Sequence, residues 1–120
     1  MTDVAKALYS FWSSFGLDAY PESNVPSDVK FPYITYTLIQ PEWDRPTTHQ
    51  ARVWYKSESY RGINAKVDEI VTRIGAGVMI PAEPGYVCIR KSNPLVQFQG
   101  IDVPELKVAY LNLQINAYTD

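Results

Sequence analysis

The stretch FPYITYTLIQPEWDRPTTHQARVWYKS, residues Phe31–Ser57, decides the fold class. Within it, Tyr33–Ile39 and Gln50–Lys56 each alternate apolar and polar side chains. Such alternation, in runs rich in Tyr, Thr and Val, is typical of half-buried strands. We therefore predict that the two runs pair as an antiparallel hairpin. The connection between them, PEWDRPTTH, is too long for a tight turn and is predicted to form an arm or flap.

Two amphipathic helices flank this hairpin in the sequence. One is predicted from Thr2 to Phe15 and the other from Tyr60 to Ile74, since each has apolar residues three and four positions apart. Gly16 and Gly75 follow them, where a glycine cap is favoured. The apolar stripes are Val4, Leu8, Phe11, Trp12 and Phe15 in the first helix, and Ile63, Val67, Ile70 and Ile74 in the second.

The rest of the chain predicts three further strands and two long loops. Val78–Ile80 and Tyr86–Lys91 read as short strands, and LKVAYLNLQINAY as a closing strand. The proline-containing segments 17–32 and 92–105 read as loops. In the closing strand the apolar phase shifts by one residue, which predicts a bulge near Tyr110. Its length of about 40 Å exceeds what one small sheet needs, so part of it is predicted to pair or pack outside its own subunit.

These elements together predict one α+β domain spanning residues 1–120. We expect an antiparallel or mixed β-sheet of about five strands, with two helices packed on one face. The chain of 120 residues has room for a single core, and its 46% hydrophobic and 20% charged content is that of a globular protein.

Composition argues against several classes of function. The net charge is -2, and the 11 basic residues are scattered, so we expect no nucleic-acid binding that relies on phosphate neutralisation. One cysteine and one histidine make a metal site improbable, and no cofactor is expected. The first residues lack the pattern of a signal peptide, and no apolar run is long enough to span a bilayer, so we expect no membrane association.

Candidate catalytic chemistry is sparse, and we predict that the protein is not an enzyme. His49 is the obvious candidate base, but it is predicted to be a solvent-exposed loop histidine because it ends the proline-rich connection. The sequence has no nucleophile motif and no glycine-rich phosphate loop. Cys88 lies in a strand pattern and is predicted to be a small buried hydrophobe. No catalytic residue is assigned.

The candidate contact residues are on the arm and on two strands. Trp43 has no periodic reason to face the core, and two interpretations stay open: a lid folded on the sheet, or a contact arm stiffened by proline. Trp54 alternates onto the face of Arg52, and the closing strand has three amides on its polar face. The predicted protein-interface residues are Glu42, Trp43, Asp44, Arg45, Arg52, Trp54, Asn112, Gln114 and Asn116.

The sequence resembles the tail terminator proteins of long-tailed bacteriophages, also called tail completion or head–tail joining proteins. The resemblance lies in the N-terminal helix, the FPYITYTL strand, and the RVWYKS strand leading into GINAKVDEIVTRIG. It continues in KSNPLVQF and in the closing strand VAYLNLQINAY.

This resemblance implies a structural virion protein without catalysis. It implies a homo-oligomer, a hexameric ring that caps the tail tube protein, ends tube polymerisation and offers a surface to the head–tail connector or stopper protein. DNA would pass through without specific binding. The location would be the tail–neck junction of the virion, and the host cytoplasm during assembly. The alternatives are a head completion or neck connector protein, and a stand-alone protein-binding module that uses the Trp43 loop.

Overall fold

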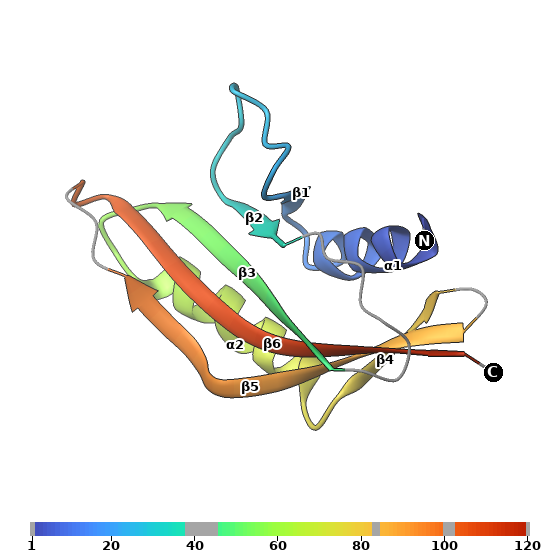
Figure 1. Ribbon diagram of the computed structural model, residues 1–120. Coiled ribbons are helices and arrows are strands. Elements are labelled where there is room, and N and C mark those ends of the chain that lie inside the picture. Colours follow the sequence, from blue (N-terminus) through green and yellow to red (C-terminus); the bar gives the residue numbers. More distant parts are fainter. Residues whose placement is uncertain (1, 38–45, 83–84, 100–102, 120) are drawn as a thin grey trace.

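The computed structural model describes residues 2–37, 46–82, 85–99 and 103–119. Over these residues the chain forms two helices and six strands (Figure 1). In chain order they are α1 (Thr2–Ser13), β1 (Asp18–Pro21), β2 (Tyr33–Tyr36), β3 (Thr47–Lys56), α2 (Arg61–Ile74), β4 (Val78–Ala82), β5 (Gly85–Gln99) and β6 (Leu106–Thr119).

The six strands form one mixed sheet in the order β1-β2-β3-β6-β5-β4. The predicted hairpin is confirmed, because β2 and β3 pair antiparallel from Tyr33 opposite Trp54 to Tyr36 opposite Ala51. The β1–β2 pair is parallel, and all other neighbouring strands are antiparallel. The long strands β5 and β6 curve across the molecule and give the sheet its curled shape (Figure 1).

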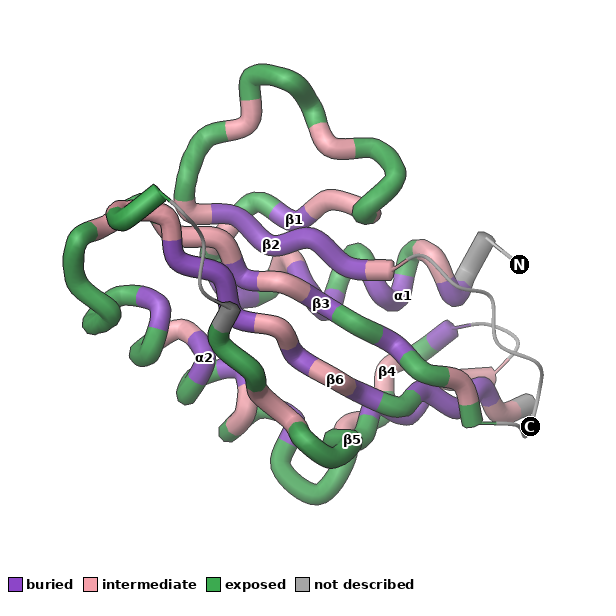
Figure 2. Tube along the Cα trace, turned by 60° about the vertical axis from the view of Figure 1, so that its left-hand side comes forward, coloured by how far each residue is buried: buried purple, intermediate pink, exposed green. Residues whose placement is uncertain are grey.

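Both helices pack on the same face of this sheet, as predicted. α1 contacts β1, β2, β4 and β5, whereas α2 contacts β3, β5 and β6. The predicted stripe of α2 is confirmed, since its four residues are the buried ones of that helix. Those of α1 are buried in the same core cluster. Figure 2 shows buried residues alternating with intermediate or exposed ones along much of β3 and the middle of β6, as expected for a sheet covered on one side.

A glycine ends α2 as the sequence predicts, whereas α1 ends at Ser13, two residues before the predicted Phe15. Gly16 lies three residues beyond the end of α1, between that helix and β1, with φ 80, a left-handed conformation that glycine adopts without steric cost. At the end of α2, Gly75 has φ 51, and its N–H donates to the Val71 carbonyl at 3.0 Å. The chain therefore leaves each helix at a fixed residue and returns to the sheet.

The two predicted loops are only partly loops, which corrects the sequence prediction. Segment 17–32 contains β1, which extends the sheet beside β2. The β5 strand runs on through 92–99, although the sequence predicts that it ends at Lys91. In each case proline misled the prediction: Pro21 is the last residue of an edge strand, and Pro94 lies in an irregular part of β5, two positions where a strand tolerates proline.

The predicted bulge near Tyr110 of β6 is wrong. β6 pairs with β3 in unbroken register from Leu106 to Ile115. The register shift lies in the neighbouring strand β5, between Lys91 and Val96. The alternation along β6 does not slip, because Val108 and Tyr110 belong to the opposite face from Ala109 and Leu111. The apparent slip arises because this end of the sheet has apolar side chains on both faces.

Most of the length of β6 is used within its own subunit. β3 pairs with one edge over Leu106–Ile115, and β5 pairs with the other edge as far as Thr119. Within the described residues, the edge toward β3 has no partner after Ile115. Pairing of this strand outside the subunit therefore stays a prediction, and it concerns only the C-terminal end of β6.

Candidate interaction surface

The sheet surface opposite the helices, here called the open face, has an ordered set of aromatic, charged and amide side chains. Residues directly opposite in neighbouring strands share a face, so the strand registers define its members. The central part of the open face consists of Tyr33, Thr35, Gln50, Arg52, Trp54, Gln97, Val108, Tyr110, Asn112, Gln114 and Asn116.

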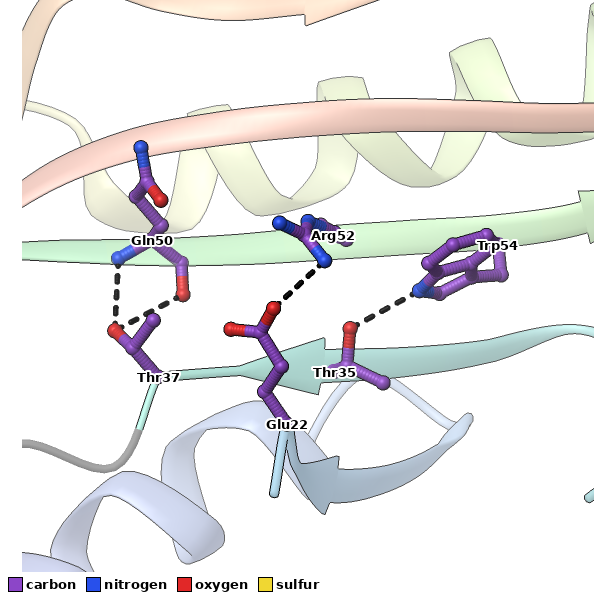
Figure 3. A network of polar contacts seen from close by, with 6 residues as sticks. All are labelled: Glu22, Thr35, Thr37, Gln50, Arg52 and Trp54. Carbon is purple, nitrogen blue, oxygen red and sulfur yellow. Dashed lines mark hydrogen bonds and ion pairs between the residues drawn. The ribbon is translucent and has the colours of Figure 1, made fainter. Parts of the chain in front are cut away.

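Trp54 is held in place by β2. Its ring stacks on Tyr33 with centroids 5.8 Å apart and an interplanar angle of 9°. Its indole Nε1–H donates to Thr35 Oγ1 at 3.0 Å (Figure 3). Tyr33 is 8% exposed, and burial raises the pKa of its hydroxyl above 10.0. Trp54 is therefore a half-buried side chain that is held in a fixed orientation.

Arg52 lies beside Trp54 on the same face and joins β3 to β6 and to the turn after β1. Its guanidinium forms an ion pair with Glu22, with Nη1 and Oε1 2.7 Å apart (Figure 3). It also lies over the Tyr110 ring, 4.7 Å from the centroid. Both Arg52 and Glu22 are partly solvent-accessible, so the pair contributes little to stability. Its main effect is to fix the direction of the guanidinium, which a partner could contact.

A row of amide side chains continues the open face along β6. Gln50 Nε2 donates to Asn112 Oδ1 at 3.1 Å. Asn112 Nδ2 donates in turn to the Pro94 carbonyl and to Gln97 Oε1, both at 3.0 Å. Asn112 thus uses both donor hydrogens and its acceptor within the subunit. It connects β3, β6 and the irregular segment of β5.

The structure brings four of the nine predicted interface residues to accessible positions on this face, namely Arg52, Trp54, Asn112 and Gln114. Asn116 belongs to the same face, but it is 9% exposed, so it offers a partner less than the sequence suggests. Glu42, Trp43, Asp44 and Arg45 lie outside the described residues. The roles of all nine as contacts stay predictions.

Sequence reasoning missed the residues that order this face. Tyr33 and Tyr110 hold Trp54 and Arg52, and Gln50 and Gln97 hold Asn112. Gln50 could have been found from the sequence, because it alternates onto the same face as Arg52. The partners on β5 and β6 could not, because the order of strands in the sheet is not encoded in local spacing.

The prediction for His49 is wrong, because this residue lies in β3 and is completely buried. Trp12 Nε1–H donates to His49 Nε2 at 3.0 Å, so the ring proton is on Nδ1, which lies 3.2 Å from Thr37 Oγ1. Burial lowers the pKa of His49 from 6.5 to about 4. The ring is therefore neutral near pH 7, and it joins α1 to the sheet.

Three further predictions concern Cys88, metal binding and membrane association. Cys88 is buried, as predicted. In the described part of the chain, no three His, Cys, Asp or Glu side chains are grouped so that they could hold a metal ion. Among the described residues, no helix is long and apolar enough to cross a membrane.

Comparison of the sequence with protein-family models gives no match, and comparison with curated proteins gives none either. Function must therefore be argued from the residues and the surface that they build.

Proposed function

We propose that this protein is a phage tail terminator, a structural protein that caps the tail tube as a ring and joins the tail to the head. The observation that carries the proposal is the open face, where Arg52, Trp54 and Asn112 are held in fixed orientations at the surface. Side chains ordered in advance lose little conformational entropy on binding, so they favour a protein partner. The sequence resemblance supplies the identity of the partners.

Ring formation requires two different contact patches on each subunit, and the number of subunits is fixed by the rotation between neighbours. The sequence predicts that the segment from Pro41 to Thr48 supplies one of these contacts. Its last two residues, Thr47 and Thr48, belong to β3 and pair with Ile115 and Gln114 of β6. A contact made by this segment would therefore be continuous with the polar end of the open face.

Tube growth would stop because the ring matches the tube end on one side and presents a different surface on the other. The weakly acidic charge of the chain supports a role in which DNA passes by without being held.

Capping can be tested with purified tube protein that polymerises in vitro. The tail terminator should shorten the tubes in electron micrographs and block their further elongation. We expect Gln114→Arg to weaken capping, because this exposed residue lies on the open face. The matched control is Asn64→Arg, which places the same charge on the exposed surface of α2. Equal effects of the two variants would argue against the open face as the contact.

Phage particles made without the protein distinguish the tail terminator from a neck connector. Overlong tubes support the tail terminator. Tails of normal length that fail to attach to heads support the connector, and they would overturn the proposed function.

A further inference from the structure

The two end strands of the sheet differ in character. β4 has the sequence VMIPA and no charged residue, and Met79, its second residue, is 53% exposed. Natural edge strands are usually protected from pairing by charges, by short length or by a covering segment. At the other end, β1 begins with the exposed Asp18, and Glu22 follows directly after it. β4 itself therefore has no charged side chain, whereas β1 begins with one.

Backbone groups on β4 are available for pairing. Pro81 has no N–H to donate to β5, and a proline in a sheet directs its nitrogen toward the open edge. Because strand residues alternate in direction, Met79, two positions earlier, directs both its N–H and its C=O away from β5. The outer edge of β4 thus offers one complete donor and acceptor pair, at Met79.

β1 offers a complementary edge. The Glu22 N–H donates to the Tyr36 carbonyl at 2.7 Å. In β1, the backbone N–H and C=O groups of every second residue counted back from Glu22 therefore point toward β2. Ala19 lies between two such residues, so its backbone N–H and C=O point away from β2, toward the outer edge of the sheet. Each copy of the chain therefore has an outward-facing donor and acceptor at both ends of its sheet.

The charges at the two ends are opposite in sign. Arg90 lies beside the start of β4, with its Cγ 3.4 Å from the position that a Cβ on Gly77 would take. Around β1 the field is acidic: the pKa of Tyr20 is raised by desolvation and then by the negative charges of Asp18 and Asp28. Opposite charges favour the approach of unlike edges and disfavour that of like edges.

We propose that β4 of one copy pairs in parallel with β1 of a second copy, which continues the sheet from subunit to subunit. A parallel arrangement places Met79 alongside Asp18 of the second copy. Both residues have side chains on the open face, because they pair with Cys88 and Tyr33. The helices of the two copies then lie on the same side of the joined sheet. This head-to-tail contact is the heterologous interface that a ring needs, so the inference rests on the proposed function.

A charge exchange between the two edges tests the pairing. We expect the unmodified protein to self-associate between micromolar and millimolar concentration in light scattering. Met79→Asp places an acid alongside Asp18 of the second copy, and Asp18→Lys places a base at the edge that Arg90 makes positive. Each variant alone should associate at least about tenfold more weakly, because like charges meet at the interface. A mixture of the two variants should regain association, because the two can alternate in the assembly. In each alternating contact, the two edges are either both unmodified or pair the introduced acid with the introduced base.

Controls separate this interface from general effects of charge. Val103→Lys changes another exposed apolar residue, in the turn before β6, and should leave association unchanged. Circular dichroism should show that all variants are folded. Full association of Asp18→Lys, together with loss in Met79→Asp, would indicate that two β4 strands pair with each other and would overturn the inference.

A monomeric unmodified protein at every concentration would also overturn it, as would failure of the mixture to regain association. The proposed function has a separate readout, because tube length reports capping whether or not the protein associates in solution.

Discussion

The buried imidazole of His49 connects the first helix to the sheet through an ordered set of donors and acceptors. Its Nε2 accepts from Trp12, and its Nδ1 lies against Thr37 Oγ1. Protonation would place a second N–H against the indole N–H of Trp12, where two donors face each other in a buried site. A charged imidazole also has no acidic side chain among these partners to offset its loss of hydration.

This arrangement predicts that acid destabilises the fold. The folded-state pKa of about 4 is below the unfolded value of 6.5, so the unfolded state binds the proton more readily. The stabilising contribution is complete above pH 6.5 and is lost as the pH falls toward 4, by about 3 kcal/mol in total. Urea denaturation at a series of pH values measures this loss. In His49→Gln, the part of the pH dependence of the unfolding free energy that comes from the histidine should vanish. An unchanged pH dependence in this variant would contradict the prediction.

His49 also shows what local pattern cannot reveal. The alternation that predicts β3 begins at Gln50, and the preceding prolines favour a loop. The residue that completes the histidine site, Trp12, is 37 positions away on a helix. Both residues were visible in the sequence, and Trp12 was correctly predicted to be in the core. Their contact depends on how the helix lies on the sheet, which periodicity does not specify.

At the scale of the elements, regular periodicity predicted α2 well. Its four buried residues repeat at helical spacing and leave a single possible face. The prediction failed where proline interrupts a strand. Pro94 lies within the four residues between Lys91 and Val96 that have no partner in β6, and the sequence gives no sign that the chain resumes pairing afterwards. The contacts that hold this segment come from another strand.

Asn112 is the residue that fixes the irregular segment of β5. Its Nδ2 group donates to the Pro94 carbonyl and to Gln97, and its oxygen accepts from Gln50. We expect Asn112→Ala to lower the free energy of unfolding by about 1–2 kcal/mol, because three partly exposed hydrogen bonds are lost together. Amide exchange should increase selectively at Leu95 and Val96, as the segment loses its anchor.

Gln114→Ala is the matched control for this change. Gln114 lies two residues further along β6 on the same face, and it forms no side-chain hydrogen bond with the described residues. Its removal should change stability by less than about 0.5 kcal/mol. Equal losses in the two variants, measured by urea denaturation, would show that the amide contacts of Asn112 do not stabilise the segment.

For the whole molecule, the sequence predicted the class of fold and the single helical layer, because the two apolar stripes each require cover. It did not predict the sheet order, and with it the composition of the open face. Tyr110 appeared to continue the core pattern of β6, whereas it lies under Arg52 on the other side. When both faces of a strand carry apolar residues, the pairing with distant strands decides which of these residues face the core.

The distribution of charge over the molecule leads to a last prediction, on DNA. Phosphate neutralisation requires clustered Lys and Arg, whereas this chain has a net charge of -2. Arg52 is paired with Glu22, and the Arg90–Lys91 run adds only two exposed charges. We expect duplex DNA to bind with a Kd weaker than about 100 µM at physiological salt, outside the range of ordinary non-specific binders. Fluorescence anisotropy of a labelled duplex measures this affinity.

Asp28→Lys combined with Glu58→Lys changes the net charge by four units, from -2 to +2, at two exposed sites, and should produce measurable, salt-sensitive binding. Micromolar binding by the unmodified protein, with a steep salt dependence, would show that the molecule holds DNA, and a ring through which the genome slides freely would then be the wrong description of it.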